Sequence, residues 1–104
     1  MVTLRQGDVF VEAVTALPDG AQKRITRERG RLVMASGEVT GHAHVITTPG
    51  VRLVACSDGV YVVSDVPFAI THEEHAPLTI MPGVYRVRIQ REWTDENEPR
   101  PVFD

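Results

Sequence analysis

The stretch VRLVACSDGVYVVS, residues 51–64, indicates the fold of this chain most directly. Two apolar runs rich in valine, Val51–Cys56 and Val60–Ser64, flank the turn sequence Ser57-Asp58-Gly59. Short runs of β-branched residues favour strands, and a short loop that contains glycine favours a hairpin between them. The stretch therefore predicts an antiparallel hairpin near the middle of the chain.

The same alternation of apolar runs and turn signals extends on both sides of this hairpin. Pairs such as Pro49-Gly50 and Pro82-Gly83 end one run and precede the next, and no window shows the apolar stripe of a helix. The spacing predicts an all-β single domain, a small barrel or sandwich of about seven or eight short antiparallel strands. Besides the hairpin, the expected strands are Asp8–Val14, Arg31–Ala35, Glu38–Thr47, Phe68–Thr71, Leu78–Met81 and Val84–Trp93. We expect the β domain to cover residues 1–93, followed by an acidic tail or arm at 94–104.

Composition and charge exclude several classes of protein. The chain has 104 residues, 42% of them apolar, with a net charge of −3 and one cysteine, Cys56. A disordered chain, a membrane-spanning helix, a disulfide framework and a cysteine zinc site are all disfavoured. The first residues lack the features of a signal peptide, and a lone cysteine suits a reducing compartment, so we expect a cytoplasmic location.

The histidines are the strongest functional signal. All four lie in two short segments, as the pair His42 and His44 and the pair His72 and His75. Alternate residues of a strand share a face, so His42 and His44 would lie about 7 Å apart on one side. Since Ala76-Pro77 stops any helix, we place His72 and His75 on a tight turn that can aim both rings the same way.

Imidazoles gathered in this way are typical ligands of a divalent transition metal. We predict a site of His42, His44, His72 and His75, with Zn²⁺ as the first choice and Fe, Ni, Mn or Cu as alternatives. Glu38 and Glu74 are the expected carboxylate partners, as ligands, as groups that fix a ring tautomer, or as a general base. An open coordination position would support metal-dependent catalysis on a small molecule.

Other functions stay open on the same residues. The histidines could line a metal-free pocket and titrate against Glu73 and Glu74, or hold a structural metal in a binding or assembly module, for instance at a homo-oligomer joint. They could also be a solvated surface. No membrane partner is expected.

A separate basic segment at 23–31 could bind the phosphates of RNA or of a nucleotide. Because no aromatic residue accompanies Lys23, Arg24, Arg27, Arg29 and Arg31, we favour a solvated loop or edge strand there, and nucleic acid is not the expected partner.

Several motifs resemble those of a family of small uncharacterised bacterial and phage-borne proteins. The resemblance rests on Gln6-Gly7-Asp8-Val9, Gly41-His42-Ala43-His44, His72-Glu73-Glu74-His75-Ala76-Pro77 and the segments around Pro82-Gly83 and Trp93. It covers most of the chain and implies no activity.

A weaker similarity is to cupins, small β-barrels that bind a metal through a His-x-His strand. His42 and His44 match that pair, but neither Thr48 nor Pro49 supplies the expected glutamate, and no histidine follows Gly83 directly. The similarity implies a cupin-like architecture without cupin chemistry.

Overall fold

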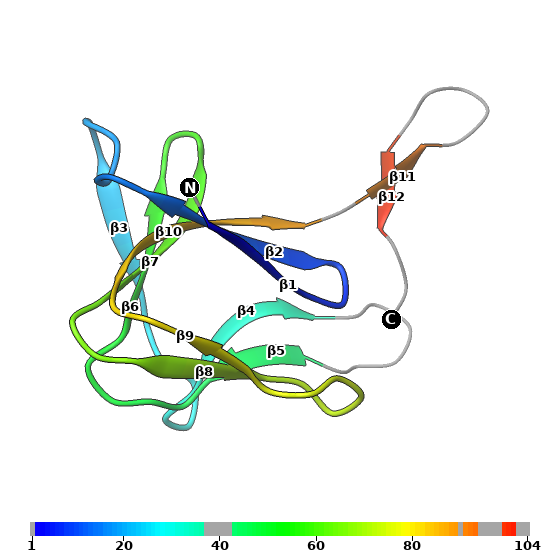
Figure 1. Cartoon of the computed structure of the whole chain (residues 1–104). Coiled ribbons are helices and arrows are strands. Elements are labelled where there is room, and N and C mark those ends of the chain that lie inside the picture. Colours follow the sequence, from blue (N-terminus) through cyan, green and yellow to red (C-terminus); the bar gives the residue numbers. More distant parts are fainter. Residues whose placement is uncertain (1, 37–42, 90, 94–98, 102–104) are drawn as a thin grey trace.

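The chain folds as two antiparallel β-sheets that face each other (Figure 1). The computed structural model describes residues 2–36, 43–89, 91–93 and 99–101, and no helix occurs within those ranges. The six-stranded sheet has the order β1-β2-β10-β7-β6-β3, with strands β1 (Thr3–Gln6), β2 (Val9–Val14), β3 (Gln22–Ile25), β6 (Arg52–Cys56), β7 (Gly59–Ser64) and β10 (Gly83–Ile89). The four-stranded sheet has the order β4-β5-β8-β9, with strands β4 (Leu32–Ser36), β5 (Ala43–Ile46), β8 (Phe68–Thr71) and β9 (Leu78–Ile80). A two-stranded ribbon pairs β11 (Arg91–Trp93) with β12 (Pro99–Pro101).

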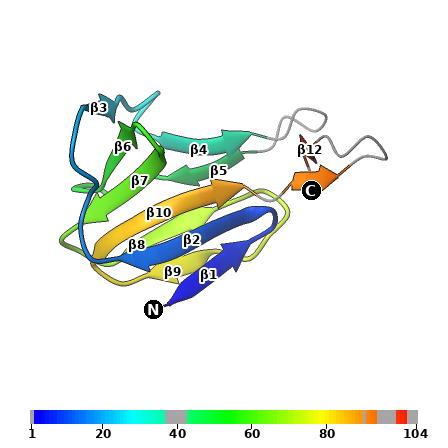
Figure 2. The ribbon, with the colours of Figure 1, turned by 90° about the horizontal axis from the view of Figure 1, so that it is seen from above.

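This architecture confirms the predicted all-β fold as a sandwich. The six-stranded sheet ends at β1 on one side and at β3 on the other, and the four-stranded sheet ends at β4 and β9 (Figure 2). The sheets therefore do not close into a barrel, and the cupin-like barrel is not confirmed. Part of the segment expected as a tail, Pro99–Pro101, forms β12.

The central hairpin is present as predicted. Strands β6 and β7 pair from Arg52↔Val63 to Cys56↔Gly59, which leaves Ser57 and Asp58 as the connection. Gly59 belongs to β7, with φ at 145°, a conformation that favours glycine.

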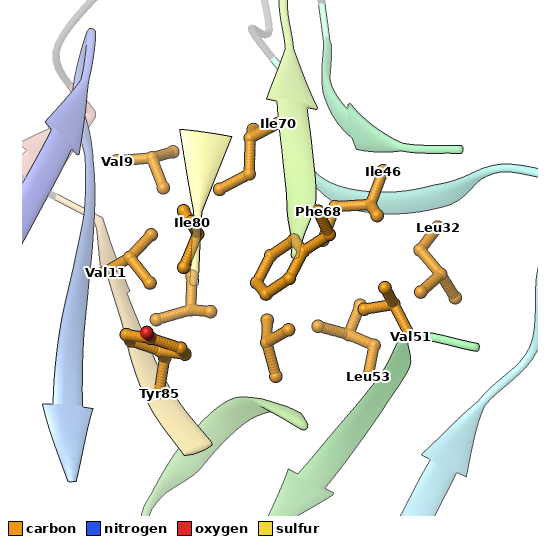
Figure 3. Packing of buried hydrophobic residues seen from close by; sticks show 12 residues of the cluster. Val9, Val11, Leu32, Ile46, Val51, Leu53, Phe68, Ile70, Ile80 and Tyr85 are labelled. Carbon is orange, nitrogen blue, oxygen red and sulfur yellow. The ribbon is translucent and has the colours of Figure 1, made fainter. Parts of the chain in front are cut away.

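The hydrophobic core lies between the two sheets (Figure 3). It contains Val9 and Val11 from β2, Phe68 and Ile70 from β8, and Tyr85 from β10, all buried. These residues alternate along their strands with exposed or half-buried ones, because successive side chains of a strand point to opposite faces. Burial of each such apolar side chain contributes about 1.5–3 kcal/mol.

Among the residues that the structure describes, no helix is long and apolar enough to cross a membrane.

Candidate functional site

Three of the predicted histidines come together at one end of the core. His44 lies on β5, two residues before the core residue Ile46, and His72 follows β8, two residues after the core residue Ile70. Residues two apart on a strand share a face, so both imidazoles continue the inner face of the four-stranded sheet. His44 and His72 are buried, and His75 is half-buried.

The rings of His44, His72 and His75, here called the histidine cluster, are close neighbours. Their centroids are 4.3 Å apart for His44 and His72, 4.6 Å for His72 and His75, and 6.1 Å for His44 and His75. The two sequence segments that carry histidines therefore meet in space. The other predicted ligand, His42, lies outside the described residues, as does Glu38.

The facing sheet contributes Gln6, which sequence analysis did not single out as a site residue. Gln6 ends β1 and is 4% exposed. It pairs with the core residue Val9 and so points into the sandwich. Its side-chain Nε2 donates to the carbonyl oxygens of Ile70 at 2.8 Å and Ala76 at 2.9 Å, on either side of the histidine turn.

This anchoring assigns a proton on His44. Because both amide hydrogens of Gln6 are used by backbone carbonyls, its Oε1 faces Nδ1 of His44, 2.8 Å away, as an acceptor. Nδ1 of His44 therefore carries a hydrogen and donates it to Gln6. The second ring nitrogen, Nε2, contacts a charged neighbour.

That neighbour is Asp8, in the turn between β1 and β2. Its Oδ1 lies 3.2 Å from Nε2 of His44, and its side chain is 13% exposed. A bare nitrogen lone pair and a carboxylate oxygen repel each other, so either a proton, carried by one of the two atoms, or a metal ion lies between them.

His72 carries its proton in the opposite position. The backbone N–H of Glu74 donates to Nδ1 of His72 at 3.0 Å. A neutral imidazole that accepts at Nδ1 holds its hydrogen on Nε2, and this Nε2 atom is buried. In this arrangement His72 is a hydrogen-bond donor, which a metal ligand at Nε2 cannot be.

The acidic residues of the turn lie at the surface, unlike the histidines beside them. The carboxylate of Glu73 accepts a hydrogen bond from the backbone N–H of Ala43 at 3.2 Å, which ties the turn to the start of β5. Glu73 and Glu74 are both exposed residues. A pocket of about 260 Å³ lies beside the hydrogen bond between Ala43 and Glu73. It is lined by Ala43, Val45, Thr71, His72 and Glu73.

Within the ranges that the structure describes, no three His, Cys, Asp and Glu side chains are arranged as a ready-made metal site. Sequence reasoning located the histidines but missed Gln6 and Asp8 as their partners. The only signal for these two was the Gln6-Gly7-Asp8-Val9 segment of the family resemblance.

Comparison with known proteins gives one match. A family model described as Domain of unknown function (DUF8820) matches residues 5–90, which is well over half of the chain and includes every residue of this site. Neither the curated proteins nor the solved structures contain a significant match.

Proposed function

The chain belongs to the DUF8820 family, and we propose that this member binds a divalent transition-metal ion between its two sheets. The proposed ligands are Nε2 of His44, Oδ1 of Asp8 and the imidazole of His75, with His42 as the fourth ligand. Zn²⁺ is the first choice for this set of nitrogen and oxygen donors, and Fe, Ni, Mn or Cu are alternatives.

The contact between His44 and Asp8 carries the proposal. Two ligands of one tetrahedral Zn²⁺ ion, each about 2.0–2.1 Å from it, lie about 3.3 Å from each other. The Nε2 to Oδ1 distance is 3.2 Å, so an ion could bind both atoms with little movement. Gln6 supports this role, because metal-binding histidines usually donate their second ring N–H to a fixed acceptor.

The spacing of the two ligand rings in the cluster is close to that expected for a shared ion. Two imidazoles bound to one ion at about 2.0–2.1 Å have ring centres roughly 5 Å apart. The ring centroids of His44 and His75 are 6.1 Å apart. Rotation of the half-buried His75 would complete the ligand set.

In this proposal His72 is not a ligand, although the sequence led us to expect that role. With its proton on Nε2, it is a hydrogen-bond donor within the cluster and beside the pocket that it lines. Such a donor would orient a water or an anion bound to the ion. The pocket favours a second candidate function, metal-dependent catalysis on a small molecule, which needs an open coordination position.

Metal content of the untagged protein tests the proposal. We expect about one equivalent of one metal per chain by inductively coupled plasma mass spectrometry, and affinity weakened about 10–100-fold by Asp8→Asn or His44→Ala. The exposed Asp19 provides the matched control, because Asp19→Asn makes the same change of charge away from the site.

Two outcomes of these measurements would contradict the proposal or its ligand set. No uptake from a panel of divalent ions would show that a proton, not a metal, joins His44 to Asp8, and the proposal would be wrong. Equal affinity in Asp8→Asn and Asp19→Asn would exclude Asp8 as a ligand. With Co²⁺ bound, a visible spectrum that changes on addition of azide would indicate the open position that catalysis requires.

We also propose a cytoplasmic location. Cys56 is the only cysteine of the chain and is a half-buried thiol. A reducing compartment keeps such a thiol from oxidation or intermolecular pairing.

A further inference from the structure

Strand β3 lies at the opposite edge of the six-stranded sheet from β1 (Figures 1 and 2), and residues of this edge line a second pocket. It has a volume of about 410 Å³, within the usual range of ligand pockets. It shares no residue with the metal site. The lining residues are Arg24, Ile25, Thr26, Arg27, Leu32, Val51 and Arg52.

Strand register places two of its arginines side by side. Arg24 of β3 pairs with Val54 of β6, and Arg52 is two residues before Val54 on the same strand. Arg24 and Arg52 therefore share the outer face of the sheet as diagonal neighbours, roughly 7–8 Å apart at their Cα atoms. Two side chains of this length can bind one anion together.

The third arginine is held in place by the backbone. Arg27 donates from Nη1 to the carbonyl oxygen of Gly30 at 2.9 Å, and from Nη2 to those of Thr48 at 2.7 Å and Val51 at 3.3 Å. These acceptors are uncharged, so they orient the half-buried guanidinium without neutralising it. Its positive charge is thus fixed at the wall of the pocket.

Among the described residues, the wall of the pocket carries no carboxylate that could balance these charges. The residues that line the pocket include none that is acidic. Over the described ranges, neither Arg24 nor Arg52 forms an ion pair. Like charges held close together destabilise each other, and a bound anion relieves that repulsion.

The inner wall of the pocket is apolar. Leu32 and Val51 are each 2% exposed, and Ile25 packs against the same core cluster. An anion with a flat organic body fits this combination better than a bare ion does, because guanidinium planes stack on rings and the apolar wall excludes water.

We propose that this pocket binds a nucleotide, with Arg24, Arg27 and Arg52 around its phosphate and the ring stacked on an arginine guanidinium at the edge of the sheet, beside the half-buried Ile25. The nucleotide can come from two sources, a free mononucleotide or one unit of a single-stranded nucleic acid. Both present the same phosphate and ring to the pocket.

Binding assays with each source test the proposal. The probes are AMP by isothermal titration calorimetry, fluorescein-labelled oligo(dT) by fluorescence anisotropy, and inorganic phosphate as the ligand without a ring. We expect the double variant Arg24→Gln/Arg52→Gln to weaken binding at least tenfold, and to lower the salt dependence of oligonucleotide binding by about two phosphate contacts. Arg27 is left unchanged, because its loss would free three backbone carbonyls.

The matched control is Arg5→Gln/Arg88→Gln, which removes two exposed arginines from β1 and β10, in the half of the same sheet that does not contain β3 and β6. It makes the same change in net charge and should keep affinity within about twofold. Binding of AMP supports a mononucleotide, and binding of oligo(dT) alone supports a nucleic acid. Equal loss in both double variants would overturn the proposal, as would the absence of binding or phosphate bound as tightly as AMP.

Discussion

Gln6 is the residue on which the geometry of the proposed metal site depends. One buried side chain makes three hydrogen bonds, to the carbonyls of Ile70 and Ala76 and to the ring of His44. Its partners are 38 to 70 residues away along the chain. No local pattern could indicate these contacts, since a glutamine at the end of a strand is an ordinary surface residue in sequence.

We predict that Gln6→Leu destabilises the fold by about 3 kcal/mol, because the buried Ile70 carbonyl, the part-buried Ala76 carbonyl and the His44 N–H lose their partner. Urea denaturation measures this loss. The control is Gln22→Leu, the same substitution at an exposed position whose amide makes one long hydrogen bond, 3.3 Å to Pro18, where we expect a change below about 0.5 kcal/mol. Equal stability of the two variants would contradict the anchoring role of Gln6.

At the scale of elements, the sequence did not indicate β1 and β3, the edge strands of the six-stranded sheet, whereas the expected bounds of β4 and β9, the edges of the four-stranded sheet, are within one residue of those observed. The expected Phe68–Thr71 matches β8, and Val51–Cys56 differs from β6 by one residue. Strand β3 was not predicted, because Gln22, Lys23 and Arg24 are exposed and carry no apolar alternation. As an edge strand β3 needs little apolar surface, and its charges oppose pairing with other chains.

The turn that carries His72 and His75 could also be predicted only in part from the sequence. A tight turn after Thr71 was predicted from Ala76-Pro77, but its docking against β1 depends on hydrogen bonds from the facing sheet. Tyr85 packs in the core as expected, whereas the side chain of Trp93 lies outside the described residues.

Hydrogen bonds to Asp58 hold the β6–β7 hairpin in place. The hydroxyl of Tyr61 donates to the carboxylate of Asp58 at 3.0 and 3.1 Å, and Arg86 of β10 donates to the carbonyl of Asp58 at 3.0 Å. Burial raises the pKa of Tyr61 above its ordinary value of 10.0, and the hydrogen bond to Asp58 adds to this rise. The neutral phenol is therefore the form that the fold favours.

We predict that the hydrogen bond from Tyr61 to Asp58 stabilises the hairpin below pH 10.0. This stabilisation is lost as the pH rises through the raised pKa of Tyr61. Phenolate absorbance in a Tyr85→Phe background, where Tyr61 is the only tyrosine, measures the midpoint. Asp58→Asn should lower that midpoint toward 10.0, because it removes the negative charge beside the hydroxyl. A midpoint unchanged by Asp58→Asn would show that Asp58 has no part in the shift.

At the scale of the whole molecule, the two proposed sites lie at opposite edges of one sheet. The metal site joins the β1–β2 turn to the four-stranded sheet, whereas the arginine pocket lies where β3 and β6 pair. In the unfolded chain Asp8 and His75 are far apart in sequence, so the proposed ligand set exists only in the folded protein. Metal binding must then stabilise the folded state.

We predict that Zn²⁺ at about 100 times its dissociation constant adds about 2.7 kcal/mol of stability, which corresponds to a rise in Tm of roughly 10–20 °C for a domain of this size. Thermal unfolding of the chelator-treated protein, with and without Zn²⁺, measures the rise. It should nearly vanish in Asp8→Asn and persist in Asp19→Asn and in Arg24→Gln/Arg52→Gln, because those positions lie outside the metal site. One bound equivalent without any rise in Tm would mean that the unfolded chain binds the ion equally well, as a local pair such as His72 and His75 could, and would exclude an ion held between the sheets.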